Sequence, residues 1–167
     1  MTKEFLIGVL SDTHIPTRAK KIPKKVLDKL SAVDLILHAG DIVTLEVIEE
    51  LKELAPVQAV AGNMDYPEVR AEFSDFKVLE IENKRIGIKH DTGSYIGLSE
   101  SARWLAAENE LDVLVFGHTH KQFLKWEEGR LYLNPGSPTH PIPPFLVKPS
   151  FALIRIGEGI EAEIITI

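Results

Sequence analysis

The stretch Leu111–His120, LDVLVFGHTH, sets an apolar run directly against a glycine and two histidines that are one residue apart. The apolar residues are typical of a short strand buried on both faces. Gly117 permits a sharp turn out of that strand, and His118 and His120 follow where it has ended. Two histidines spaced in this way in a loop can reach different points of one cavity. The stretch therefore predicts a buried strand that delivers two imidazoles to a site at its carboxyl end.

Four other apolar runs are followed by groups that can bind a metal. They are EFLIGVL, DLILHAG, PVQAVAG and the run that ends in IKH. Because the carboxyl ends of parallel strands converge on one edge of a sheet, groups far apart in sequence are expected to meet there. With the two histidines above, seven candidate ligands result: Asp12, His14, Asp41, Asn63, His90, His118 and His120.

The order of the predicted elements indicates an α/β fold. The first half alternates apolar strands with two amphipathic stretches, IPKKVLDKLSAV and TLEVIEELKEL, which predict crossover helices after Pro23 and Thr44. The second half predicts three hairpins, with turns at Asn83–Lys84, Glu128–Gly129 and Gly157–Gly159. One further helix, LSESARWLAAENE, has Ser99 as its expected cap. The pattern predicts two sheets packed face to face with helices outside.

Two features stand apart from these elements. The segment NPGSPTHPIPPFLVKPS carries six prolines between Pro135 and Pro149, which predicts an ordered loop or rim in place of a central strand. Trp104 and Trp126 are interpreted as core or interface aromatics.

Composition bounds the class of protein. With 167 residues, of which 44% are hydrophobic, the chain is expected to form one domain over residues 1–167. No apolar run approaches the roughly 20 residues of a membrane span, so a cytoplasmic protein without membrane contact is expected. A formal charge of −6 makes nucleic acid an unlikely partner, although five basic residues lie between Arg18 and Lys25. A homodimer or higher homo-oligomer stays open.

The ligand types indicate which metals to expect. The chain has no cysteine, so imidazole, carboxylate, amide and water are the available ligands. Such a set favours manganese, iron, cobalt, nickel or zinc, whereas an all-oxygen site favours calcium or magnesium. Seven groups are too many for one tetrahedral ion, but two ions that share Asp41 would use them all. Paired ions about 3.5–4 Å apart suit an in-line displacement at phosphorus, which predicts phosphate ester hydrolysis.

The ordered motifs D-x-H, G-D, G-N, H and G-H-x-H resemble the signature of the calcineurin-like metallophosphoesterases. The likeness is greatest to their small, single-domain archaeal and bacterial phosphodiesterase branch, and it covers nearly the whole chain, including the NPGS of Asn134–Ser137. It implies a four-layer α/β/β/α sandwich of two mixed sheets. It also implies one metal held by Asp12, His14, Asp41 and His120, and a second held by Asp41, Asn63, His90 and His118.

On this resemblance the expected enzyme is a binuclear phosphodiesterase. A water that bridges two divalent ions, with manganese first among the candidates, would attack a small phosphodiester substrate. Asp41, Asn63 and His118 are the expected catalytic residues, because the amide of Asn63 would neutralise charge on the phosphoryl oxygens together with the ions.

The chain departs from the family pattern at two positions. Met64 stands where many members have a histidine that is thought to help the leaving group, and methionine cannot donate a proton. Asp65, His38 or a metal-bound water would then have to assist, so hydrolysis of diesters or activated esters is expected to exceed that of monoesters. Asp91 stands where glycine is frequent.

Two other functions are compatible with the same motifs. The stretch SDTHIPTRAKKIP also resembles the phosphoesterase-fold subunit of the eukaryotic retromer coat, so a protein-interaction scaffold is one alternative. The complete set of seven ligands argues against it. A metal-dependent nuclease is the other, and the acidic balance of the chain disfavours it.

Overall fold

The computed structural model describes residues 4–167, which form fourteen helices and strands. One sheet contains β1 (Phe5–Leu10), β2 (Leu35–His38), β3 (Val57–Ala59), β9 (Ser150–Ile156) and β10 (Ile160–Thr166). The other contains β4 (Phe76–Ile81), β5 (Lys84–Lys89), β6 (Val113–Phe116), β7 (Gln122–Glu127) and β8 (Arg130–Pro135). The helices are α1 (Lys24–Leu30), α2 (Leu45–Lys52), α3 (Pro67–Glu72) and α4 (Glu100–Glu108).

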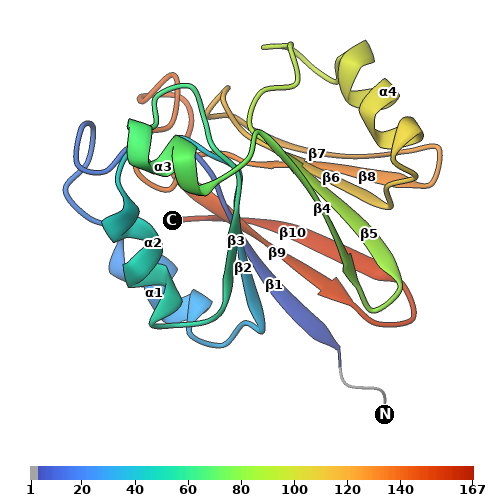
Figure 1. The fold of residues 1–167 in the computed structure, drawn as a ribbon, viewed down its shortest axis with the longest axis horizontal. Helices are drawn as coiled ribbons and strands as arrows, with labels where there is room; N and C mark the ends of the chain where they lie inside the picture. The colour runs from blue at the N-terminus through green and yellow to red at the C-terminus, as the bar shows by residue number, and fades with distance from the viewer. Residues whose placement is uncertain (1–3) are drawn as a thin grey trace.

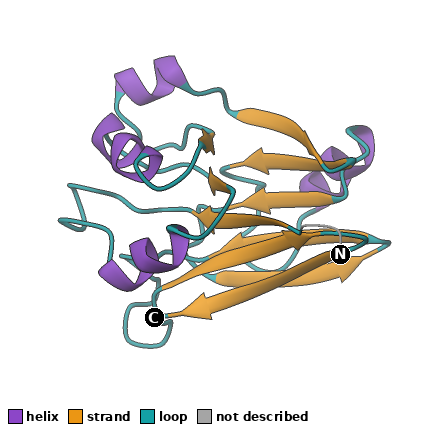
Figure 2. Ribbon diagram, turned by 90° about the horizontal axis from the view of Figure 1, so that it is seen from below, coloured by secondary structure: helices purple, strands orange, loops and turns teal. Residues whose placement is uncertain are grey.

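Both sheets are mixed. The first has the order β10-β9-β1-β2-β3, in which β1, β2 and β3 are parallel and the hairpin of β9 and β10 joins antiparallel to β1. The second has the order β4-β5-β6-β8-β7, with β5, β6 and β8 parallel and an antiparallel strand at each edge. The strands lie in the middle of the molecule and the helices outside them (Figures 1 and 2). The predicted arrangement of two mixed sheets between helices is confirmed.

Alternate residues of the strands build the layers, because successive side chains of a strand point to opposite faces. Ile7 and Val9 of β1 join Val113 and Val115 of β6 in the core between the two sheets. Leu114 of β6 faces the other way, toward α4. Central strands such as β2 and β6 therefore serve two apolar layers and are buried along their whole length, whereas the edge strand β10 exposes alternate polar residues and the edge strand β7 is also partly exposed.

The helices cover the outer faces of the two sheets. Buried residues of α1 and α2, such as Leu30 and Ile48, pack against Ile36 in the first sheet. On the second sheet, Ala102 and Ala106 of α4 lie against residues that include Leu114. Trp104 points away from this contact and is 64% exposed, and Trp126 on β7 is 47% exposed. The interpretation of these tryptophans as core residues is wrong, and their interpretation as interface aromatics stays a prediction.

Some local predictions also need correction. The short helix α3, which follows the loop that carries Asn63, was not predicted from the pattern. Thr44 precedes α2, but its side chain makes no capping hydrogen bond to the helix. Ser99 does cap α4, since its hydroxyl accepts a hydrogen bond from the N–H of Ala102 at 3.0 Å. The turn between β4 and β5 lies one residue earlier than predicted, because Lys84 already belongs to β5.

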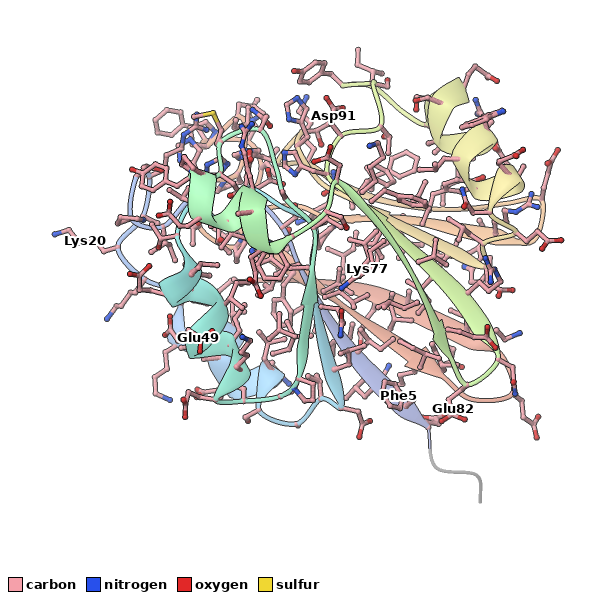
Figure 3. All side chains as sticks on the ribbon, in the orientation of Figure 1. Phe5, Lys20, Glu49, Lys77, Glu82 and Asp91 are labelled. Atoms are coloured by element: carbon pink, nitrogen blue, oxygen red, sulfur yellow. The ribbon has the colours of Figure 1, made fainter. Side chains whose placement is uncertain are left out.

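A hydrogen bond joins an edge strand of one sheet to an edge strand of the other. Lys77 of β4 donates to the side-chain oxygen of Gln58 on β3 at 2.6 Å, and Figure 3 shows it reaching between the two strands. The proline-rich segment is a loop over residues 136–149, as predicted, but Asn134 and Pro135 end the central strand β8 and Ser150 begins β9. Within residues 4–167, none of the helices has the length and apolar character that a membrane crossing requires.

Candidate metal centre

The structure brings all seven predicted side chains to one place. They lie in the segments that follow β1, β2, β3, β5 and β6, so both sheets contribute to a single cluster. The cluster divides into two groups that share Asp41. We call Asp12, His14 and His120 the buried group, and Asn63, His90 and His118 the open group.

The buried group is closed to solvent. Asp12, His14 and His120 are at most 3% exposed, and with Asp41 their ligand atoms all lie within 4.8 Å of one another. The Nε2 atoms of His14 and His120 are 3.1 Å apart. His120 Nε2 lies 3.3 Å from Asp12 Oδ1, and His14 Nε2 lies 3.4 Å from Asp41 Oδ2. Four ligand atoms thus surround one point.

The open group faces Asp41 from the other side. His90 Nε2 lies 3.2 Å from Asp41 Oδ2, the oxygen that also faces His14. Asn63 Oδ1 lies 3.0 Å from His90 Nε2 and 3.1 Å from His118 Nδ1. Asn63 is exposed and His118 is half-buried, so this side of the cluster reaches solvent.

Backbone carbonyls orient two of the imidazoles. His120 Nδ1 lies in hydrogen-bond contact with the carbonyl of His140, and His90 Nδ1 lies 2.7 Å from the carbonyl of Ala39. A carbonyl only accepts, so each Nδ1 carries the proton and donates it. In its neutral form each ring then presents the lone pair of Nε2 to the cluster, which is how proteins orient histidines that bind metals.

The cluster has the chemistry of a cation site. Asp12 Oδ1 is fully buried and accepts no hydrogen bond from any residue in the range 4–167, although His120 Nε2 is 3.3 Å away. A buried carboxylate oxygen without a partner is costly. In the buried group with Asp41, and again among Asp41, His90 and His118, the ligand atoms lie within 4.8 Å of one another. A divalent cation in each of these two places would satisfy their lone pairs. The residues present therefore fit a pair of metal ions.

The backbone at this cluster is unusual. Asp12, His14, Asp41, His118 and His120 have φ between 46° and 71°, a region that costs most residues about 1–3 kcal/mol. Neighbouring segments hold these turns. The N–H of Asp12 donates to the carbonyl of Gly40 at 3.0 Å, and the hydroxyl of Ser137 donates to the carbonyl of Asp12 at 2.7 Å. Backbone strain of this kind concentrates at functional sites.

The charges of the cluster shift several pKa values. Burial raises the pKa of Asp41, but His90 and the N–H of Met64 lower it to about 2. Burial lowers the pKa of His90, but hydrogen bonding to Asp41 and the charges of Asp12 and Asp41 raise it to about 9. Burial lowers the pKa of His38 to about 3. His38 is therefore neutral, and it accepts from the N–H of Gly40 while it bonds Thr13 Oγ1 at 3.0 Å. It supports the loops and lies outside the ligand groups.

Sequence reasoning named Asp65 only as a group that could assist the leaving group, and it missed Arg70. Asp65 accepts from the N–H groups of Val43 and Gly62, each at 2.6 Å, so both of its oxygens are engaged. Arg70 of α3 donates to the carbonyls of Asn63 and Asp65. Asp65 is thus a structural brace and not a free proton donor. The spacing of Asp65 and Arg70 carries no family motif, and only the unpredicted helix α3 brings them together.

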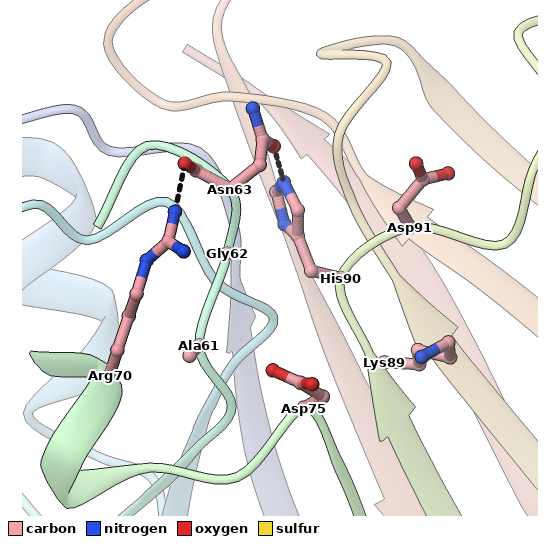
Figure 4. A pocket seen from close by; sticks show the side chains of 8 residues that line it. All are labelled: Ala61, Gly62, Asn63, Arg70, Asp75, Lys89, His90 and Asp91. Carbon is pink, nitrogen blue, oxygen red and sulfur yellow. Dashed lines mark hydrogen bonds between the residues drawn. The ribbon is translucent and has the colours of Figure 1, made fainter.

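A pocket of about 230 Å³ adjoins the open group. Asn63 and His90 line it on the side of the cluster, together with the charged side chains of Arg70, Asp75, Lys89 and Asp91 (Figure 4). The two basic and two acidic side chains in this lining balance one another in charge. His140 lies on the buried side of the cluster, where its ring is 5.7 Å from that of His120.

Comparisons with known proteins agree with this geometry. The calcineurin-like phosphoesterase superfamily domain matches residues 5–159. A probable metallophosphoesterase of Methanothermobacter thermautotrophicus is 46% identical over 96% of this chain and 92% of its own length. A second from Methanocaldococcus jannaschii is 42% identical over 98% of this chain and 82% of its own. Among solved structures, Vps29 of Entamoeba histolytica complexed with Zn²⁺ aligns with a TM-score of 0.79 at 28% identity, over 97% of this chain and 99% of that one.

Proposed function

Because the chain belongs to the calcineurin-like phosphoesterase superfamily, we propose that it is a phosphodiesterase that uses two divalent metal ions. The observation that carries the proposal is that Asp41 belongs to both ligand groups. Neighbouring ligand atoms in these groups, Asp41 Oδ2 among them, lie 3.0–3.4 Å apart. One ion would be held by Asp12, His14, Asp41 and His120, and the other by Asp41, Asn63, His90 and His118. When bound, such ions supply a nucleophilic water at neutral pH and neutralise the charge of the phosphoryl group.

Asn63 has a second task in this proposal. Its Oδ1 faces His90 and His118, and Figure 4 shows its amide nitrogen directed away from His90. The Nδ2–H group can therefore donate to a phosphoryl oxygen, where charge grows in the transition state. Arg70 holds the Asn63 backbone from behind, so the donor is positioned before substrate binds.

The rim of the site supports a diester in preference to a monoester. Met64 is 45% exposed beside Asn63 and cannot protonate a leaving group. Asp91 Oδ2 lies 3.8 Å from His118 Nε2, and this carboxylate disfavours a substrate with two negative charges over one with a single charge. The pocket of about 230 Å³ has room for one ester group of a small phosphodiester. Manganese is our first choice of metal, with nickel, iron, cobalt and zinc as alternatives for the same ligands.

The proposal is tested by metal content and turnover together. The chain is stripped with a chelator and reloaded with manganese or nickel, and metal per chain is measured by elemental analysis. Hydrolysis of bis(p-nitrophenyl) phosphate is compared with that of p-nitrophenyl phosphate. We expect two ions per chain, faster turnover of the diester, and a loss of about 10³-fold or more in Asp41→Asn. Asp28→Asn is the matched control, because Asp28 is an exposed partner of Lys24 on α1.

A protein-interaction scaffold is the second candidate. The likeness to Vps29 over 97% of this chain favours it. Two bound ions without turnover of any ester would support the scaffold and contradict the enzyme. A nuclease is the third, and its mark would be shortening of DNA or RNA that the Asp41→Asn change abolishes.

A further inference from the structure

A tyrosine that no motif singles out lies over the open group. Tyr95 belongs to the loop between β5 and α4, and its hydroxyl lies 2.8 Å from His118 Nε2. The two rings are 5.3 Å apart and tilted by 51°. Tyr95 is nevertheless 68% exposed, so the hydroxyl bond to His118 places it at the rim of the site without burying it.

The loop holds Tyr95 at this rim through its own hydrogen bonds. The carbonyl of Thr92 accepts from the hydroxyls of Ser99 and Ser101, which ties the loop to the start of α4. Asp91 Oδ1 accepts from the N–H of Gly93 at 2.8 Å at the other end. These bonds anchor the loop before Tyr95 and at the start of α4, and the hydroxyl of Tyr95 adds its own contact with His118.

The tautomer of His118 decides what the hydroxyl of Tyr95 can do. Without a metal ion, His118 Nδ1 donates to Asn63 Oδ1 at 3.1 Å, because an amide oxygen only accepts, and Nε2 then accepts from the hydroxyl of Tyr95. When His118 instead uses the lone pair of Nδ1 to hold a metal ion, the proton of the neutral ring sits on Nε2. Nε2–H then donates to the oxygen of Tyr95. The hydroxyl hydrogen of Tyr95 is left without a partner in that contact and is free to donate outward, into the space above the cluster.

A donor at this rim complements what the neighbouring side chains lack. Met64 cannot donate, both oxygens of Asp65 accept from backbone N–H groups, and Asp91 is an acceptor. The hydroxyl of Tyr95 lies one imidazole ring away from Asn63 Oδ1, the oxygen that contacts His118 Nδ1. His118 thus joins Tyr95 to Asn63, although the pocket at Asn63 and the pocket at Tyr95 have different lining residues.

We propose that Tyr95 orients His118 and donates its hydroxyl hydrogen to an oxygen of the bound phosphate ester. The inference rests on the proposed function and deepens it, because it assigns to Tyr95 a contact with the substrate. No proton is transferred in this contact: the hydroxyl keeps its hydrogen and stabilises the anionic oxygen through a charge-assisted hydrogen bond.

The test compares Tyr95→Phe with Tyr66→Phe in the full chain. Tyr66 is 43% exposed, and its hydroxyl makes no hydrogen bond to residues 4–167, so it is a matched tyrosine whose hydroxyl does not contact His118. Binding of manganese to the stripped chain, and of inorganic phosphate to the loaded chain, is measured by calorimetry. The kcat and KM for bis(p-nitrophenyl) phosphate are measured at the manganese concentration that gives every variant equal occupancy.

We expect Tyr95→Phe to bind the second manganese equivalent about 10-fold more weakly, because the partner that orients His118 is lost. At equal occupancy, phosphate should bind about 3- to 10-fold more weakly and kcat/KM should fall about 10- to 100-fold. The nitrogen chemical shifts of His118 should show a proton on Nε2 in a wild-type chain loaded with zinc, which is diamagnetic. Tyr66→Phe should match wild type in each measurement.

The outcomes separate the inference from the proposed function. Equal phosphate binding in Tyr95→Phe and wild type, at two ions per chain, overturns the role of Tyr95. A wild-type chain that binds phosphate through manganese but hydrolyses no ester overturns the proposed function, and the comparison of phosphate affinities still decides on Tyr95. A chain that binds neither manganese nor phosphate overturns both.

Discussion

The buried and open groups have similar side chains but different surroundings. Asp12, His14 and His120 lie at most 3% exposed under the proline-rich loop, whereas Asn63 and His118 reach solvent beside Tyr95 and the pocket. Asp41 belongs to both groups. The difference shows that a cluster with one chemical composition has an inner half that is enclosed by the fold and an outer half that a substrate can reach.

Electrostatics follow the same division. In the inner half a carboxylate oxygen of Asp12 is buried without a hydrogen bond from residues 4–167, so a cation there would relieve a folding cost. In the outer half the loops carry donors and charges that face solvent. We therefore expect the inner half to govern retention of metal and the outer half to govern affinity for substrate.

The largest expected effect comes from removing one histidine of each group. His120→Ala should lose the ion of the buried group and lower kcat/KM by about 10³-fold or more, since a metal ion contributes several kcal/mol to the transition state. His118→Ala should keep the ion of the buried group, so that one ion per chain remains. Its activity should fall mainly because the ion of the open group is lost. Elemental analysis and kinetics on the same samples check both expectations.

Circular dichroism and thermal melts show whether each variant is folded before its metal content is read. Equal retention of the buried ion in His120→Ala and His118→Ala would contradict the difference between the two halves.

The next effect is a pH dependence of the chelator-treated chain. Its folded state raises the pKa of His90 to about 9 from the usual 6.5, because Asp41 and Asp12 outweigh the effect of burial. A raised pKa adds stability that is fully present below pH 6.5 and is lost as the pH rises through 9. We expect the free energy of unfolding to fall by about 3 kcal/mol over this range.

Urea unfolding of the stripped chain at several pH values between 6.5 and 9.5 measures this change. His90→Ala should flatten the profile. The same slope in wild type and His90→Ala would show that another group is responsible.

The smallest effect concerns two glycines, one beside each half. A methyl group at Gly117 would lie 1.9 Å from Ser11 Oγ and 2.7 Å from Asp12 Oδ2, so Gly117→Ala should cost about 1–3 kcal/mol and displace Asp12. At Gly97 there is open space, but φ is 65°, so Gly97→Ala should cost about 1 kcal/mol through the backbone alone. Denaturant unfolding and metal content measure both variants. Loss of the buried ion in Gly97→Ala would contradict this assignment.

Much of the fold was readable because its strands are short apolar runs bounded by turn residues. The strands that end before Asp12, Asp41 and His118 and the three hairpins were predicted in this way. The pattern failed at α3, which is only six residues long, and at Trp104, because a tryptophan in a helix suggests burial and only packing shows which face is covered.

In the candidate site, too, local sequence patterns could be recognised and tertiary contacts could not. Ligand types are local, so Asp, Asn and His after strand ends could be recognised one motif at a time. The supporting residues act through tertiary contacts: Asp65 with Val43, Arg70 with Asn63, and Tyr95 with His118. Loops form such contacts without periodicity or fixed spacing, so no sequence pattern predicts them.

The sequence by itself determined the alternation of apolar strands, the chemistry of the seven ligand side chains and the order in which they follow the strands, because each of these depends on neighbouring residues. Only the tertiary structure decided that Asp41 faces both groups, that one group is enclosed while the other is open, and that Tyr95 lies over His118. These relations depend on how the two sheets stack and where their loops meet, and distances between residues far apart in the chain arise only when it is folded.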